Sequence, residues 1–475
     1  MPDTTDRPRV GRRAFLGLTA ASLGAAWVAA CERSAQDVLS PGRGLGPLFG
    51  KGGGSTTRNP LRIPQIVSPS ALTLQAAPGT ASFGGTQTST AWMYNGQFPG
   101  PTIVANSGGT ATIQFVNALG EESITHWHGM KVDDANDGHP RLAVPPGDSY
   151  SYQFAIAQRA ALNWYHPHPH MLTGKQVYYG LAGAFIVRDA EETALSLPSG
   201  AYEVPLIIRD ASFDSAGNLK FGSKASGFIG SDPLVNGTRS PMLAVDKALY
   251  RFRILNGCNA RVLRLALNPG APFTLIGNDG GLLTSATSIG EITLAPAERL
   301  DVLLDLGGLA AGESVMLRCL DAGWDLLELR GTGAVTANAT IPTGTLSSIT
   351  PLSGPATPTR TFSFDGMTRI NGVVYDISRI DFRVPVGQVE RWRFRTNGNA
   401  PHPVHVHGTS FQVQSRTGGR DQLYPWESGW KDTVLLGDRE TVDILIKFER
   451  TGLYLIHCHQ LAHEDQGMMS NFLVV

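Results

Sequence analysis

Short alternations of apolar and polar residues recur along the chain from about residue 70. They are clearest in Gly109–Leu119, Glu298–Leu306 and Glu440–Phe448. Because successive side chains of a strand point to opposite faces, each segment is predicted to be a β-strand with one buried face. The apolar residues expected on the buried faces of the last two segments are Leu300, Val302, Leu304, Val442, Ile444, Ile446 and Phe448. No long segment has the spacing of an amphipathic helix.

Turn-forming residues separate these strands. The chain has 55 Gly and 30 Pro among 475 residues, and only 17% of its residues are charged. This composition predicts an all-β fold of Greek-key β-sandwiches. At about 150 residues per domain, the length allows about three domains. A boundary near Asp189 and a Thr/Ser/Pro/Gly-rich stretch from about 331 to 361 predict sandwiches over residues 62–189, 198–340 and 358–475.

The first residues have the pattern of an export leader. Arg12 and Arg13 precede an apolar run of small residues that ends before Cys31, which is typical of a twin-arginine signal over residues 1–31. A membrane-spanning helix is the alternative, but the run is short for a span of about 20 residues. Cys31 follows a lipobox-like "VAA" and is predicted to carry a lipid anchor; ordinary cleavage nearby is the alternative. Residues 32–61 are Gly/Ser/Pro-rich and predict a flexible tether.

The formal charge of −1 gives no basic surface for nucleic acid. The unusual feature is the placement of histidine, since all but His139 of the 12 His fall in four short groups. The groups are "HWHG" (His126, His128), "HPHPH" (His166, His168, His170), "HPVHVHG" (His402, His405, His407) and "HCHQLAH" (His457, Cys458, His459, His463), with Met468 ten residues after the cysteine. His139 and His170 are predicted to be bystanders, or to support ligands from outside, rather than to bind metal themselves.

The spacing of these groups has a geometric meaning. On a strand, the two histidines of H-x-H point to the same face and can bind one metal ion or two adjacent ions. His457 and His459 therefore share a face, and Cys458 points to the other. One short segment can thus serve two metal centres, joined by a covalent path through the backbone of Cys458.

The donor types indicate copper. Structural zinc sites use thiolate pairs, and the chain has no C-x-x-C. Two imidazoles, one thiolate and a weak thioether describe a blue-copper electron-transfer site, which His402, His463, Cys458 and Met468 supply. With His170 set aside, the other eight grouped histidines form four pairs, and ligation by imidazole alone suits a copper cluster.

The chain resembles multicopper oxidases of the bacterial laccase and copper-efflux type. The four histidine groups match in order and spacing, and five further stretches match in type: "GLAGAFIVRD", "NGCNARVLRL", "GNDGGLL", "GWKDTV" and "HEDQGMM". The resemblance implies three cupredoxin-like domains and four copper ions. It implies a type 1 copper at Cys458, His402 and His463 with axial Met468, a type 2 copper at His126 and His405, and type 3 coppers at His128, His166 and His459 and at His168, His407 and His457.

The resemblance also implies a mechanism. The type 1 copper takes single electrons from a donor, which we expect to approach an exposed edge of His402, and a cluster between the first and third domains reduces O₂ to water. Asp137 and Glu464 match acids of the family and are predicted to be proton relays; the alternative is that they only orient imidazoles. We expect the middle domain, which has no His, to be a structural spacer, with shaping of a substrate rim as the alternative.

The electron donor is less well determined. Copper-efflux oxidases have a Met-rich insertion, and an acid and a Met before the first type 1 histidine; this chain has 9 Met, with Gly398 and Ala400 at those two positions. A phenol or aromatic-amine oxidase (a laccase) is therefore the first hypothesis, and a Cu(I) or Mn(II) oxidase is the alternative. A scaffold without copper, as in some division proteins, is disfavoured because every ligand is present. We expect an exported monomer of the periplasm or cell envelope, and buried free thiols at Cys258 and Cys319 rather than a disulfide.

Overall fold

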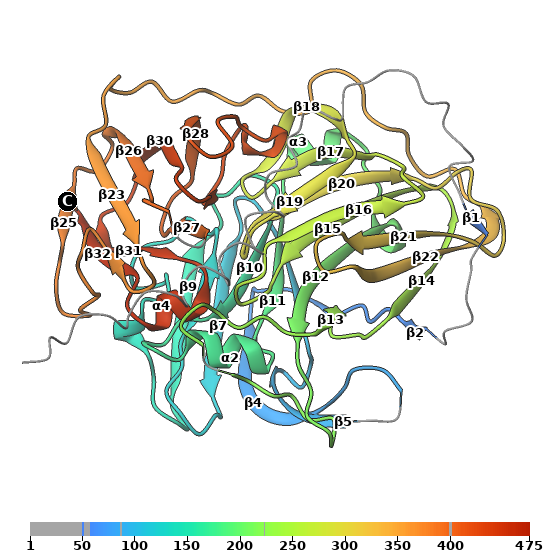
Figure 1. The fold of residues 1–475 in the computed structure, drawn as a ribbon, viewed down its shortest axis with the longest axis horizontal. Helices are drawn as coiled ribbons and strands as arrows, with labels where there is room; N and C mark the ends of the chain where they lie inside the picture. The colour runs from blue at the N-terminus through green and yellow to red at the C-terminus, as the bar shows by residue number, and fades with distance from the viewer. Residues whose placement is uncertain (1–49, 52–57, 86–87, 223, 399–400) are drawn as a thin grey trace, which may run out of the picture. The chain divides into compact units, whose positions relative to one another are not determined.

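The computed structural model describes residues 50–51, 58–85, 88–222, 224–398 and 401–475 (Figure 1). The predicted twin-arginine signal, the lipid anchor at Cys31 and most of the predicted tether lie outside this part of the chain. Within it, no helix is long and apolar enough to cross a membrane.

The N-terminal third of the described chain forms two sheets. One has the order β5-β4-β7-β9 and the other the order β3-β6-β11-β10-β8. In the second sheet β11 pairs parallel with β6 and antiparallel with β10, a mixed pattern that requires crossing connections. The strands are β3 (Ile66–Val67), β4 (Leu72–Ser82), β5 (Thr88–Tyr94), β6 (Thr102–Asn106), β7 (Thr110–Asn117), β8 (Thr125–His128), β9 (Ser149–Ala155), β10 (Ala161–Pro167) and β11 (Gly183–Arg188).

The middle of the chain forms two larger sheets, with the orders β13-β12-β15-β20-β17-β18 and β19-β16-β21-β22-β14-β2. The strand β2 (Asn59–Pro60) comes from the end of the predicted tether and pairs with β14, and β1 (Gly50–Lys51) pairs with β21. The other strands are β12 (Glu203–Ala211), β13 (Asp232–Val235), β14 (Pro241–Lys247), β15 (Leu249–Asn256), β16 (Leu263–Asn268), β17 (Phe273–Asn278), β18 (Gly281–Ile289), β19 (Glu291–Leu294), β20 (Arg299–Asp305), β21 (Glu313–Cys319) and β22 (Trp324–Val335).

The C-terminal part forms the last two sheets, with the orders β24-β23-β26-β30-β28 and β25-β32-β31-β27-β29. Their strands are β23 (Arg360–Asp365), β24 (Arg369–Ile370), β25 (Phe382–Val384), β26 (Val389–Arg395), β27 (His402–Val406), β28 (Phe411–Thr417), β29 (Thr433–Leu436), β30 (Thr441–Lys447), β31 (Gly452–Cys458) and β32 (Met469–Val474). The helices are short: α2 (Thr173–Tyr179), α3 (Ala190–Ala194), α4 (Leu461–Asp465) and 3₁₀ turns at Pro140–Leu142, Gly200–Tyr202 and Pro425–Glu427.

The apolar faces predicted to be buried are buried, but β20 and β30 do not alternate as predicted, because Asp301, Leu303 and Leu445 on their opposite faces are buried as well. Val442, Ile444 and Ile446 are buried in one core, and Leu300 and Val302 are buried in another. The all-β class and the cupredoxin-like sandwiches are therefore as predicted. The three domain ranges proposed above remain predictions, although each pair of sheets draws its strands from one stretch of the chain, apart from β1 and β2.

Candidate metal centre

Strand pairing places the four histidine motifs side by side as two pairs. In the N-terminal sandwich β8 lies antiparallel to β10, and His126 is directly opposite His166. In the C-terminal sandwich β27 lies antiparallel to β31, and His405 is opposite His457. Each sandwich therefore presents two H-x-H segments side by side, with their imidazoles on one face.

The two faces meet, and the eight imidazoles lie in one cluster. The Nε2 atoms of His166 and His459 are 3.4 Å apart, and so are those of His168 and His457. Two further pairs of rings stack across the contact, with centroids 3.9 Å apart for His126 and His407 and 3.7 Å apart for His128 and His405. All eight side chains are buried. The predicted position of the cluster, between the first and third sandwiches, agrees with these contacts.

Several rings are fixed by one nitrogen and leave the other without a protein partner. Nδ1 of His126 lies 2.6 Å from the Asp137 carbonyl oxygen, and Nδ1 of His405 lies 2.8 Å from the Asp432 carbonyl oxygen. His128 is turned the other way, since its Nε2 lies 3.0 Å from Asp432 Oδ1. Among the described residues, the remaining nitrogens of these three rings (His126 Nε2, His405 Nε2 and His128 Nδ1) have no hydrogen-bond partner, although they are buried.

Orphaned, buried ring nitrogens are the atoms that a metal ion would satisfy. Burial, assisted by the neighbouring rings, lowers the pKa of His126, His128 and His405 well below 6.5. The rings are therefore neutral, which is the form that binds metals. Two nitrogens bound to one ion at about 2.0 Å are roughly 3.3 Å apart. His407 and His457 have their Nε2 atoms 3.0 Å apart, close to that value.

The predicted type 3 triads differ in how closely the structure gathers them. His168, His407 and His457 offer ligand atoms within 4.8 Å of one another, as the second triad requires. His126 and His405 likewise group together, with His407 as the third member. The triad of His128, His166 and His459 is looser. His166 lies close to His459, but the ligand atom of His128 groups with those of His126 and His166 instead of with His459.

The predicted type 1 residues converge in the core of the C-terminal sandwich. Cys458 Sγ lies 3.5 Å from His402 Nδ1 and 3.6 Å from His463 Nδ1. Met468 is buried in the same core, and its carbonyl accepts a hydrogen bond from the Cys458 N–H at 3.1 Å. Burial raises the pKa of the Cys458 thiol, so this environment favours the thiolate only when a cation binds it.

One expectation about this site is wrong. The His402 ring has no exposed edge, since its exposed fraction is 0%, and its Nε2 is buried without a hydrogen-bond partner among the described residues. The ring lies against Phe364, with centroids 6.0 Å apart. The sequence led us to expect that electrons enter through an exposed edge of His402, but the folded chain buries the residue.

Both predicted acids contact the cluster. Asp137 is fully buried, and its Oδ2 lies 2.7 Å from His407 Nδ1. Burial, together with Asp134 and Asp133, raises the pKa of Asp137 well above 3.8. Glu464 is buried as well, with Oε2 3.2 Å from His457 Nδ1. Each carboxyl group thus reaches a different ring of the same cluster.

The sequence did not reveal Asp432 or Thr433 as site residues. The contact between Asp432 and His128 joins positions 304 residues apart, so no local pattern announces it. The only signal was the "GWKDTV" stretch, which matched in type but had no assigned role.

The residues outside the predicted ligand set make other contacts. His139 is buried, with Nε2 2.9 Å from Asn471 Oδ1, and His170 packs edge-on against Tyr375. Cys258 and Cys319 are buried free thiols, so the disulfide alternative is not realised.

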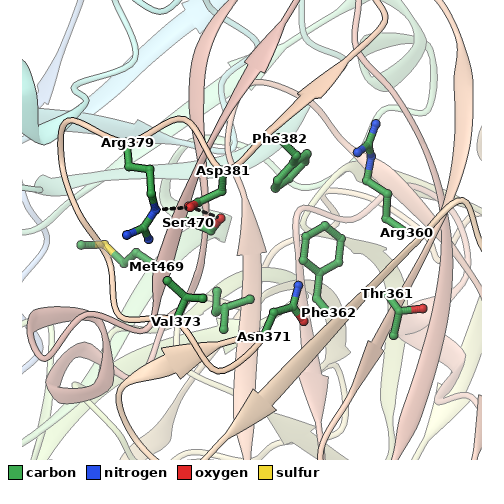
Figure 2. A pocket seen from close by; sticks show the side chains of 11 residues that line it. Arg360, Thr361, Phe362, Asn371, Val373, Arg379, Asp381, Phe382, Met469 and Ser470 are labelled. Carbon is green, nitrogen blue, oxygen red and sulfur yellow. Dashed lines mark hydrogen bonds and ion pairs between the residues drawn. The ribbon is translucent and has the colours of Figure 1, made fainter.

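A cavity of about 390 Å³ lies elsewhere in the C-terminal sandwich, between β23–β24 and β25–β32 (Figure 2). Phe362, Phe382 and Met469 form its apolar walls, and Arg379 and Asp381 pair with each other at its rim. No predicted metal ligand lines it. This cavity is therefore separate from the imidazole cluster and the cysteine site.

Comparison with protein families agrees with this geometry. Two family models, both described as multicopper oxidase, match residues 75–192 and 349–475. The multicopper oxidase mco of Staphylococcus haemolyticus (strain JCSC1435) is 34% identical over 411 residues, which cover 85% of this chain and 88% of the relative. The cell division protein FtsP of Dickeya dadantii (strain 3937) is 32% identical over 459 residues, which cover 90% and 95% of the two chains.

Solved structures are similar over most of the chain. McoA multicopper oxidase from Aquifex aeolicus superposes with a TM-score of 0.81 at 35% identity, over 88% of this chain and all (100%) of that one. The laccase-like CueO of Ochrobactrum sp., described as active towards lignin model compounds, gives 0.78 at 29% identity, over 88% and 100%. A Campylobacter jejuni multicopper oxidase, described as a metallo-oxidase, gives 0.73 at 28%, over 87% and 96%.

Proposed function

Because the chain belongs to the multicopper oxidase family, an oxygen-reducing class of oxidoreductases, we propose that it is a laccase-like member. In this proposal it couples the one-electron oxidation of phenols or aromatic amines to the four-electron reduction of O₂ to two waters. Four donors each lose one electron, and four protons enter with them. The observation that supports the proposal best is the convergence of buried, partnerless imidazole nitrogens beside a separate thiolate site.

The proposed ligands follow from the family pattern and from the contacts above. Bound copper supplies one-electron transfer at the cysteine site and O₂ reduction at the cluster. The type 1 site is Cys458, His402, His463 and Met468; the type 2 site is His126 and His405; the type 3 sites are His128, His166 and His459, and His168, His407 and His457. This set holds four ions per chain.

The segment from His457 to His459 connects the two sites. Cys458 points into the sandwich core, while the flanking imidazoles lie in the cluster. Only backbone and side-chain bonds separate the Cys458 sulfur from either ring. The alternation of a single strand thus provides the covalent path that electron transfer needs.

We assign proton delivery to Asp137 and Glu464. The Asp137 carboxyl group can carry a proton on Oδ1, which has no hydrogen-bond partner among the described residues, to the side of the cluster near His407, and the Glu464 carboxyl group can do so near His457. Since both carboxyl groups are buried, bulk water does not reach them in the described structure, and each also orients the ring that it contacts.

The electron donor is assigned from what the chain lacks. It has 9 Met in all, and Gly398 and Ala400 stand where cuprous oxidases of the family have an acid and a Met. The similarity to the Ochrobactrum enzyme favours aromatic donors. Oxidation of Cu(I) or Mn(II) is the second candidate, favoured by the similarity to the Campylobacter metallo-oxidase.

A role in cell division without catalysis, suggested by the similarity to FtsP, has less support. A pure scaffold has no use for eight buried imidazoles with inward-facing nitrogens, because each partnerless buried nitrogen destabilises the fold. We also propose export by the twin-arginine route to the periplasm or cell envelope, a lipid anchor at Cys31, and a monomeric enzyme.

Copper analysis and donor kinetics test the proposal. The purified chain is loaded with copper, and we expect four ions per chain and an intense blue absorption band. O₂ uptake is then measured with a phenol, an aromatic amine, Cu(I) and Mn(II). A higher kcat/KM for the organic donors supports the laccase assignment, and a higher value for a metal ion supports the second candidate. Zinc in place of copper, or no O₂ uptake with any donor, refutes both.

A further inference from the structure

Arg299 is a fully buried arginine at the start of β20 in the middle sandwich, and all five of its N–H groups are used. Its Nε donates to the Leu162 carbonyl at 2.9 Å. Its Nη1 donates to the Ala297 carbonyl at 3.0 Å and to Asp432 Oδ1 at 2.7 Å. Its Nη2 donates to the Asp279 carbonyl at 3.2 Å and to the other Asp432 oxygen. One guanidinium therefore joins all three sandwiches.

Asp432 carries this contact into the metal centre. Its Oδ1 lies 3.0 Å from His128 Nε2 and accepts the Thr433 hydroxyl at 2.9 Å. Its carbonyl oxygen lies 2.8 Å from His405 Nδ1. Side chain and main chain of one residue thus hold two stacked rings, which belong to different proposed copper types.

The middle sandwich surrounds this pair with further buried charge. Lys431, next to Asp432, has its Nζ 2.9 Å from Asp279 Oδ2 and 3.2 Å from Glu298 Oε1. Burial opposes the charge of Arg299, but Asp432 and Asp279 outweigh it and raise its pKa, so the guanidinium stays charged. The carboxylate of Asp432 therefore has a permanent, fixed counterion.

The fit between this ion pair and the histidine segment is tight. Gly129 follows His128 with φ +89°, and a Cβ there would lie 2.8 Å from Arg299 Nη2 and 2.9 Å from Asp432 Oδ2. The guanidinium and the Asp432 carboxylate therefore pack directly against the backbone that follows His128.

We propose that Arg299 is a positioning residue for the copper cluster, which acts through Asp432 to fix the tautomer and orientation of His128 and His405. The middle sandwich, expected to be a spacer, then takes part in building the metal centre although it has no ligand. This inference depends on the proposed ligand set. With Nε2 of His128 and Nδ1 of His405 held by Asp432, only His128 Nδ1 and His405 Nε2 can face an ion.

Lysine cannot replace this arginine. A Lys ammonium keeps the charge but has three donors and no planar fork, so it cannot hold both Asp432 oxygens and three carbonyls. Loss of a partner that orients a ligand typically weakens metal binding about 10–100-fold. We expect Arg299→Lys to weaken cluster copper by that factor and to leave the blue type 1 site unchanged.

Arg251→Lys is the matched control. Arg251 is an equally buried arginine of the same sandwich, and its Nε and Nη2 pair with Asp301, away from the histidines. Copper per chain is measured at fixed free copper concentrations, together with the type 2 electron paramagnetic resonance spectrum, the blue band and the Tm of the copper-free protein. Arg299→Lys should lose cluster copper and change that spectrum, and Arg251→Lys should match the parent in both.

Two outcomes overturn the inference: parental copper affinity and spectrum in Arg299→Lys, or an equal loss of cluster copper in Arg251→Lys, which would indicate general destabilisation. If Arg299→Lys does not fold, Asp432→Asn decides by the same two readouts, because it keeps the side-chain shape and removes the charge. A parent chain that binds no cluster copper at all would refute the proposed function instead, so the two failures are distinguishable.

Discussion

Replacement of Asp137 by asparagine distinguishes proton delivery from simple orientation of a ring. Asn has nearly the same shape, and the backbone carbonyl that contacts His126 is unchanged. The amide oxygen can still accept a hydrogen bond from His407 Nδ1, which lies 2.7 Å from the present carboxylate. What the variant loses is the ability to hold and release a proton.

Proton delivery and ring orientation predict different losses of O₂-reduction rate in Asp137→Asn. A hydrogen bond to a charged partner stabilises by about 1.5–3 kcal/mol, and a neutral one stabilises by about 0.5–1.5 kcal/mol. Replacing the carboxylate by an amide therefore weakens the hydrogen bond that orients His407 by about 1 kcal/mol. That loss corresponds to less than about tenfold in rate. A positioned general acid contributes about 10²–10⁴-fold. We therefore expect Asp137→Asn to slow O₂ reduction by at least about 100-fold while it keeps its copper and its blue band.

The assay is steady-state O₂ uptake at saturating donor, with copper content and the blue band measured on the same sample. Asp148→Asn is the control, because Asp148 is an exposed acid of the same sandwich and does not contribute to the pKa shift of Asp137. Asp137→Ala should in addition lose copper, since it leaves the His407 N–H without an acceptor. A fully loaded Asp137→Asn protein with turnover within tenfold of the parent would refute the relay.

Three further predictions concern other parts of the molecule. Cys458→Ser should abolish the blue band and all turnover, as absorption spectra and O₂ uptake will show, because an alcohol does not replace the thiolate; a surviving band would contradict the type 1 assignment. Gly129→Ala should lower the free energy of unfolding about 1–3 kcal/mol more than Gly147→Ala. Both glycines have similar positive φ (+89° and +87°), but only Gly129 has atoms within 3 Å of an added Cβ, so equal Tm losses would contradict the packing argument. Burial opposes the charge of Glu203, but Arg253 and the neighbouring arginines lower its pKa to about 2, so its contribution is present above about pH 4.5 and lost as the pH falls toward 2. Glu203→Gln should therefore cost about 3 kcal/mol at pH 7 and about 1 kcal/mol at pH 3, and a Tm difference from the parent that does not shrink on acidification would contradict the pKa assignment.

Local features of the chain were predictable without coordinates. Alternation along a strand depends only on backbone geometry, so the buried faces around Val302 and Ile444 could be inferred from the sequence. The same rule placed His457 and His459 on one face and Cys458 on the other. Ligand identity was also readable, because thiolate, thioether and imidazole have preferences that do not depend on the fold.

What only the tertiary structure decided are the contacts between distant segments. His166 meets His459 across 293 residues, and Asp432 meets His128 across 304. The burial of His402 and the arrival of Arg299 from the middle sandwich likewise depend on how sheets and sandwiches pack. Pattern along a strand determines which way a side chain points, but the packing of other segments determines what it meets there. The sequence by itself therefore specified the donors of this protein, and the folded chain specified how they are held.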